Sequence, residues 1–306
     1  MSGDTATRPA VEESLGLGIA AALLCFMFFS SMDALAKWLG ATYAVAQLLF
    51  FRSLFGFLPV VVVAWREGGL RSLKTRRPGL HLLRGLFILG ALGLYFQGLK
   101  HLHLAEALAI AFTAPLFMTA LAGPILGEKV GTRRWGAVIV GFIGVLIMVR
   151  PEPEKLQLEA LYVLGSAFCF ALTSLTTRVL TRSEGTASIM FYSTLGIFIP
   201  SLIALPVDWI TPDLPDLALF FAMGLLGGLG LLTLTTAYRN APASVIAPLD
   251  YSSLIWAVLF GWIGWGVFPE TSVWYGAVIV AAAGIYIAQR EAAVKRRAEA
   301  AQAASG

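Results

Sequence analysis

Charged residues are scarce in this sequence. Only 13% of its 306 residues are Asp, Glu, Lys or Arg, whereas 58% are hydrophobic and the mean hydropathy is +0.79. A soluble domain of this length carries about a quarter charged residues, so the shortage excludes an ordinary soluble protein. The net charge of +4 does not indicate a nucleic-acid partner, because the basic residues lie between apolar runs, where they report membrane topology.

Cysteine, histidine and catalytic motifs are equally sparse. The two cysteines, Cys25 and Cys169, lie inside apolar runs and predict core packing, not a disulfide framework. Histidine occurs only three times, and the sequence contains no Walker A, HExxH or GxSxG motif. We therefore expect no metal site, no cofactor and no ATP-driven pump. A channel is disfavoured because no filter sequence appears.

Long apolar runs are abundant instead. Each is roughly 17 to 25 residues long, the length with which a helix crosses a hydrocarbon core about 30 Å thick. We expect an all-α integral membrane protein with transmembrane helices at 15–39, 43–65, 82–99, 105–126, 135–149, 161–180, 188–206, 217–238, 243–263 and 273–289. The first run has no small-residue cleavage site, so it reads as a membrane anchor and not as a removed signal peptide.

The distribution of basic residues predicts the orientation of these ten helices. Lysine and arginine gather around residues 66–84, 129–134, 178–182, 239 and 290–297, whereas the alternate loops hold only Lys100, Arg150 and Lys155. Cytoplasmic loops are enriched in basic residues. We therefore expect both termini in the cytoplasm, with cytoplasmic tails at 1–14 and 291–306.

The sequence repeats itself. The segment RWGAVIV at 134–140 returns as WYGAVIV at 274–280, and an offset of 141 residues aligns Phe50 with Phe191 and Pro59 with Pro200. The expected units are two five-helix repeats, at 15–150 and 151–290. Because five is an odd number, the second repeat enters the membrane from the opposite side. Inverted repeats of this kind surround a midplane substrate site in secondary transporters.

Several short motifs resemble the EamA-type transporters of the drug/metabolite transporter superfamily. They are AEA at 105–107, PLF at 115–117, LGE at 126–128, Gly136, Gly144-Val145 and YSSLIWA at 251–257. The segment SMDALAKW at 31–38 is similar to the first helix of members linked to uptake of riboflavin or S-adenosylmethionine. The second half departs from the family pattern, because Gly266 is followed by Val267 where a glutamate is usual. The resemblance implies a ten-helix metabolite transporter.

Ionisable residues inside the spans are the first candidates for a binding site, because a charge at membrane depth is costly unless it finds a partner. Asp33 and Lys37 lie one helical turn apart and form either a local ion pair or part of a site. Arg52 lies mid-span, where its planar fork suits a substrate carboxylate or phosphate, or pairs with Asp33 or Asp250. Asp250 suits a cationic group or a coupling proton.

Aromatic and hydroxyl residues complete the predicted site. Tyr95, Tyr251 and Trp256 combine an apolar body with a polar tip, which suits a planar organic ligand. We expect Pro115 and Pro248 to interrupt their helices beside a polar cavity. The predicted substrate-binding residues are Asp33, Lys37, Arg52, Tyr95, Gln97, Thr113, Ser174, Asp250, Tyr251 and Trp256.

These features predict a carrier in the bacterial inner (cytoplasmic) membrane that moves a small organic metabolite by alternating access. The mixed charges indicate an amphoteric substrate, such as a vitamin, an amino acid or an S-adenosylmethionine-like compound. A membrane-embedded enzyme, or a lipid-handling protein using the same carboxylates, is the alternative. The lipid bilayer is the expected environment. Import or export, coupling to protons, and a monomer or a homodimer all remain open at this stage.

Overall fold

The structure, a computed structural model, describes residues 9–126, 132–149, 158–180, 183–240, 246 and 249–305. All regular structure in these ranges is helical, which confirms the expected all-α class. The helices are α1 (Pro9–Gly40), α2 (Val45–Arg66), α3 (Pro78–His101), α4 (Leu104–Ala111), α5 (Ala114–Leu126), α6 (Thr132–Val149), α7 (Leu158–Leu180), α8 (Thr186–Ala204), α9 (Leu214–Asn240), α11 (Ser253–Trp265) and α12 (Thr271–Ser305).

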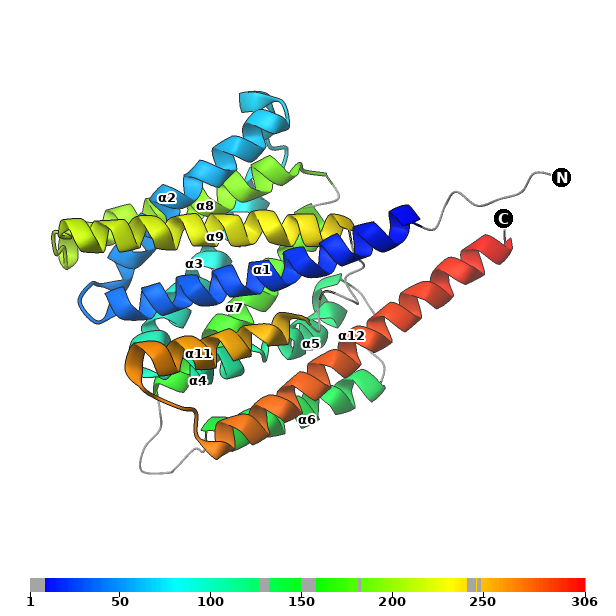
Figure 1. Cartoon of the computed structure of the whole chain (residues 1–306). Coiled ribbons are helices and arrows are strands. Elements are labelled where there is room, and N and C mark those ends of the chain that lie inside the picture. Colours follow the sequence, from blue (N-terminus) through cyan, green and yellow to red (C-terminus); the bar gives the residue numbers. More distant parts are fainter. Residues whose placement is uncertain are drawn as a thin grey trace.

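Seven helical stretches in the described ranges are long and apolar enough to cross a membrane. They lie on α1, α2, α3, the α4–α5 pair, α7, α8 and α9. The α6 and α12 helices carry the shorter apolar stretches Trp135–Ile147 and Thr271–Ile287. The first turn of α1 and the last turn of α12 lie at the same end of the bundle (Figure 1).

Helices from the two halves of the chain pack against each other in matched pairs (Figure 1). The α1 helix lies along α9, and α3 lies along α7. The α2 helix contacts both α8 and α9, while α8 also contacts α3. The two echoed segments meet as well, because α6 packs along α12. The halves of the chain are therefore interleaved in one bundle, and the contacts recur when the halves are exchanged.

Close packing between the halves depends on glycine. A Cβ at Gly228 of α9 would overlap the ring of Pro59, which lies inside α2. A Cβ at Gly144 of α6 would lie 3.0 Å from the Gly276 carbonyl oxygen of α12. Small residues let membrane helices approach closely, and glycine at these positions allows the contacts between the halves.

Two apolar stretches are interrupted. The fourth expected span divides into α4 and α5 at Phe112 and Thr113, and Pro115 follows in the first turn of α5, where proline fits. In the ninth expected span, a 3-10 turn at Asp250–Ser252 directly precedes α11. The second proline expected to cause an interruption, Pro248, lies outside the described residues.

Candidate functional site

A polar cluster lies within the main apolar core, where α1, α2 and α3 approach one another. The hydroxyl of Tyr95 on α3 donates a hydrogen bond to Asp33 Oδ2 on α1, at 3.2 Å, and both side chains are buried. The guanidinium of Arg52 on α2 interacts electrostatically with the same carboxylate. A buried carboxylate needs such partners, because desolvation penalises an isolated charge.

The Arg52 guanidinium keeps one donor unused in this cluster. Its Nε is fully buried and has no hydrogen-bond partner among the described residues. Gly227 of α9 makes room for the group, since a Cβ at that position would lie 3.8 Å from a terminal nitrogen and 3.9 Å from Nε. A planar fork with a free donor binds a carboxylate or phosphate group well.

Lys37 takes other partners than the neighbouring Asp33. Its ammonium donates to the Leu99 carbonyl at 2.9 Å and to the Leu102 carbonyl at 2.6 Å. It also lies 5.5 Å from the centre of the Trp265 ring. The local ion pair considered from the one-turn spacing is therefore not formed in the described part of the chain. The last carbonyls of α3 lack partners within their own helix and attract the lysine instead.

A small, shallow pocket lies beside Lys37, at the end of the bundle where α1 and α11 finish and α4 begins. Its other lining residues include His103, Leu104, Trp265 and Pro269. His103 Nδ1 lies 3.5 Å from a carboxylate oxygen of Glu106, one helical turn away. Lys37 thus borders this pocket rather than the Asp33 cluster.

The candidates around α11 lie in a different part of the bundle. Asp250 lies near Cys25 of α1, and its carbonyl accepts a 2.5 Å hydrogen bond from the Ser253 hydroxyl. The Tyr251 ring meets Phe112 edge to face, with 4.8 Å between ring centres. Trp256, on α11, stacks on Phe260. The carboxylate whose charge acts on Arg52 is that of Asp33, without an ion-pair contact between these two described side chains; the predicted alternative, a pair with Asp250, is not formed between described residues either.

The remaining three candidates stay apart from the cluster. Thr113 is buried and donates to the Ile110 carbonyl at 2.8 Å, inside the break between α4 and α5. Gln97 on α3 and Ser174 on α7 are half-buried, and no hydrogen bond joins either side chain to another described group. The structure therefore brings together Asp33, Arg52 and Tyr95 out of the ten predicted residues.

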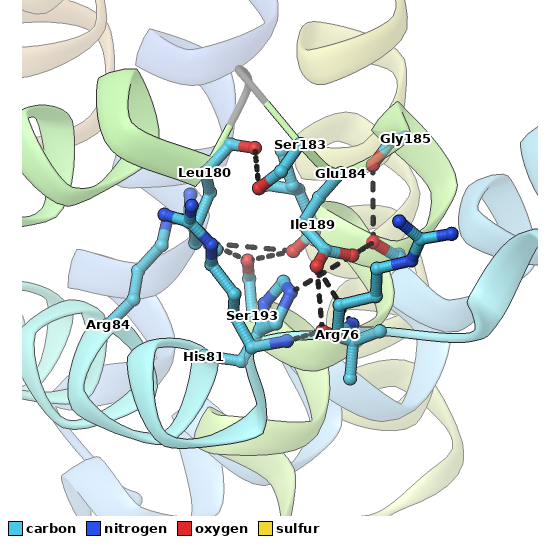
Figure 2. Close-up of polar contacts among 12 residues, drawn as sticks. Arg76, His81, Arg84, Leu180, Ser183, Glu184, Gly185, Ile189 and Ser193 are labelled. Carbon is cyan, nitrogen blue, oxygen red and sulfur yellow. Dashed lines mark hydrogen bonds and ion pairs between the residues drawn. The ribbon is translucent and has the colours of Figure 1, made fainter.

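A second buried arginine, Arg84 on α3, was predicted only as a topology signal. Its Nε donates to the Thr177 hydroxyl of α7 at 2.7 Å, and a terminal nitrogen donates to the Ser193 hydroxyl of α8 (Figure 2). The same nitrogen reaches the Ile189 carbonyl at 3.5 Å. Arg84 therefore joins three helices through hydroxyl and carbonyl acceptors.

Sequence reasoning missed polar contacts between loops at the two ends of the bundle. Tyr43 donates to Asp216, and Thr75 donates to Glu184, across the halves of the chain. One signal was present in the sequence, because the repeat offset of 141 residues aligns Tyr43 with Glu184 and Thr75 with Asp216. Hydroxyl and carboxyl groups at matched loop positions would have identified the pairs.

Comparison with known proteins gives consistent matches along the whole chain. The model of the EamA-like transporter family matches twice, over residues 16–150 and 157–289. The S-adenosylmethionine uptake transporter of Rickettsia bellii is 33% identical over 282 residues, covering 91% of this chain and 96% of that protein. The riboflavin transporter of Rhizobium johnstonii is 32% identical, covering 95% and 97%.

Two further matches extend the comparison. The pseudopaline exporter CntI of Pseudomonas aeruginosa is 29% identical, covering 91% of this chain and 98% of that protein. A solved crystal structure shares the fold with a TM-score of 0.64 at 20% identity, covering 90% of this chain and 97% of the solved one. The architecture is thus shared beyond the sequence relatives.

Proposed function

The chain belongs to the EamA-like transporter family, as the sequence motifs indicated, and from this premise we propose that it moves a small amphoteric metabolite by alternating access. The family and the named bacterial relatives identify a multi-pass transporter of small metabolites in the bacterial inner membrane. The proposal adds the mechanism, the substrate class and the site to that assignment.

The proposed architecture is ten transmembrane helices in two inverted five-helix halves, with both termini in the cytoplasm. The double family match supports two repeats. The matched helix contacts support an axis that exchanges them, because α1 with α9 is the counterpart of α3 with α7. The gathering of basic residues on alternate loops supports the orientation. Such repeats rock against each other around a fixed central site.

The proposed substrate site is centred on Arg52, Asp33 and Tyr95. The observation that carries it is the buried Arg52 Nε, which has no partner in the described part of the chain although a carboxylate and a tyrosine hydroxyl lie in the same cluster. A substrate carboxylate would complete the hydrogen bonds of the guanidinium, and Asp33 would balance a cationic group on the same molecule.

This pairing of charges favours a substrate that carries both signs. S-adenosylmethionine has a carboxylate together with ammonium and sulfonium groups, and the name of one relative states its uptake. Riboflavin has neither a carboxylate nor an ammonium group, and the name of another relative states its transport. We propose the amphoteric class for this chain because Arg52, whose Nε is buried, and the buried Asp33 have opposite charges.

Reconstituted transport tests the proposal. Purified protein in sealed proteoliposomes is assayed for uptake and efflux of labelled S-adenosylmethionine, riboflavin and several amino acids, with and without a pH gradient. We expect an amphoteric compound to cross and Arg52→Ala to abolish its movement. Arg71→Ala, at an exposed arginine in the α2–α3 loop, is the matched control. Movement of riboflavin alone, or full activity in Arg52→Ala, would contradict the proposed site.

A further inference from the structure

One group of contacts joins the α2–α3 loop of the first half to the α7–α8 loop of the second, and we call it the Glu184 latch (Figure 2). Glu184 Oε1 accepts hydrogen bonds from the Thr75 hydroxyl at 3.1 Å and the Arg76 amide at 2.9 Å. In the same loops, Glu67 Oε2 accepts one from the Ala187 amide at 3.0 Å.

The Glu184 carboxyl is held in its charged form. Burial alone raises its pKa, but the hydrogen bonds from the Arg76 amide, the Thr75 hydroxyl and the Ser188 hydroxyl, together with the nearby His81, outweigh that effect. The net pKa lies below the ordinary value for glutamate. The Glu184 latch therefore rests on charge-assisted hydrogen bonds.

A second group of contacts, the Asp216 latch, joins the α1–α2 loop and the first turn of α2 to the segment between α8 and α9 and to the first turn of α9. The Tyr43 hydroxyl donates to Asp216 Oδ2 at 2.6 Å. Gln47 donates to the Ile210 carbonyl at 2.6 Å and accepts from the Ile210 amide at 3.3 Å. Burial and the nearby Asp216 raise the pKa of Tyr43 to about 12, so its hydroxyl remains a donor.

The two latches lie at opposite ends of the bundle. Tyr43 lies two residues before α2 and Glu67 immediately follows it, and a helix of 22 residues spans about 33 Å. Arg52 lies on α2 between them. Both latches are closed in this structure, and Asp33 and Tyr95 are buried.

The latches are also counterparts under the sequence repeat. The offset that aligns Phe50 with Phe191 aligns Tyr43 with Glu184 and Thr75 with Asp216. Each latch therefore joins the same two positions of the repeat. In both cases the first half supplies the hydroxyl and the second half supplies the carboxylate. Exchange of the halves converts one contact into the other, as a pseudo-two-fold axis requires.

We propose that Glu184 and Asp216 are the paired gate residues of this transporter, each holding one end of the bundle closed. This inference rests on the proposed alternating access. Opening of the Glu184 latch exposes the Arg52 site at the end where α2 finishes, and opening of the Asp216 latch exposes it at the end where α2 begins. Strict alternation needs one latch to stay closed while the other opens.

Thiol labelling from each face tests the gates without any substrate. Met32, on α1, is buried close to the Arg52 side chain of α2. When Cys25 and Cys169 are both replaced by alanine, the substitution Met32→Cys places a single thiol near the site. An impermeant sulfonated maleimide is applied to right-side-out and inverted vesicles, and the rate of labelling is measured. Labelled S-adenosylmethionine uptake is measured in parallel with the native-cysteine protein.

Each gate variant should open one face only. Glu184→Gln should raise labelling about tenfold from the face that carries the α2–α3 loop, the factor expected for loss of about one charge-assisted hydrogen bond. Asp216→Asn should do the same from the opposite face. Thr75→Val and Tyr43→Phe each remove the hydroxyl that donates to one of these carboxylates, and serve if a carboxyl variant does not fold.

The control and the contrary outcomes separate the two proposals. Asp208→Asn, at an exposed acid between α8 and α9, should leave labelling unchanged. Equal labelling from both faces, or no increase in any folded variant, overturns the paired gates even when wild type transports. One-sided labelling in a protein that transports none of the tested compounds supports the gates and counts against the proposed substrate class.

Discussion

Arg52 and Arg84 are both arginines in the interior of the bundle, but their donors are used differently. Arg84 directs its Nε to Thr177 and a terminal nitrogen to Ser193, both on second-half helices. Arg52 lies near Asp33, yet its Nε has no partner among the described residues. The difference shows that burial alone does not identify a binding arginine. A guanidinium whose donors are occupied joins helices, whereas one with a free donor can accept a ligand.

The largest effect that separates the two arginines is expected on transport. Arg52→Lys keeps the positive charge but removes the planar fork, so substrate uptake should fall at least about a hundredfold, the loss expected for a charge-assisted bidentate contact. Uptake rates in proteoliposomes measure it, and thermal unfolding in detergent monitors the fold. Arg84→Lys is the paired control, and an equal loss of uptake in both variants would remove the distinction.

The next effect is on stability and concerns Arg84. Arg84→Ala leaves the buried Ser193 hydroxyl without its arginine donor and removes the link among α3, α7 and α8, so we expect a loss of about 3 kcal/mol. Thermal or denaturant unfolding in detergent measures this loss. Transport per folded molecule should stay near the wild-type level. A variant that is as stable as wild type would show that Arg84 is dispensable for packing.

A smaller change at Tyr95 tests whether the substrate binds at the Arg52 cluster. Tyr95→Phe removes only the hydroxyl that donates to Asp33. The loss of one hydrogen bond of about 1 kcal/mol should raise the KM for substrate about fivefold, with a stable fold. Tyr162→Phe, on α7, is a matched tyrosine control. A KM that does not change in Tyr95→Phe would place substrate binding away from this pair.

The Glu184 latch should make the stability of the folded protein depend on pH in the acid range. Because the folded pKa of Glu184 is lowered, its stabilising contribution is complete above the unfolded value of about 4.3 and is lost as pH falls through the folded pKa. The unfolding temperatures of wild type and Glu184→Gln are measured between about pH 3 and 7. The amount by which wild type is more stable than the variant should decrease as the pH falls. If the stability difference instead increased as the pH fell, the pKa of Glu184 would not be lowered in the folded protein.

The smallest transport effect is expected at Asp250. No ion pair joins its carboxylate to another described residue, whereas the guanidinium of Arg52 interacts with Asp33. Asp250→Asn should change uptake less than about threefold, a change of less than about 1 kcal/mol, while Asp33→Asn should reduce it strongly. The two variants are assayed side by side in the same vesicles. Loss of transport in Asp250→Asn would extend the site to the 3-10 turn before α11.

Much of the architecture could be predicted from the sequence because its signals are local or periodic. The scarcity of charge and the length of the apolar runs predicted a helical membrane protein, and the echo of 134–140 at 274–280 predicted a repeated unit. The break in the fourth span was predicted at Pro115, and it lies at Phe112 and Thr113, just before that proline. Hydropathy and helix breakers depend on neighbours along the chain, so they can be read from sequence.

The choice of partners was decided by the tertiary structure alone. The sequence named Asp33, Lys37, Arg52 and Asp250 as charges inside the spans, but it left open which of them would meet. Packing of α1, α2 and α3 brought Arg52 to Asp33 and carried Lys37 to the carbonyls that end α3. Periodicity specifies the face of one helix, whereas a contact also depends on how distant helices are rotated and placed. Those relations arise only when the bundle packs.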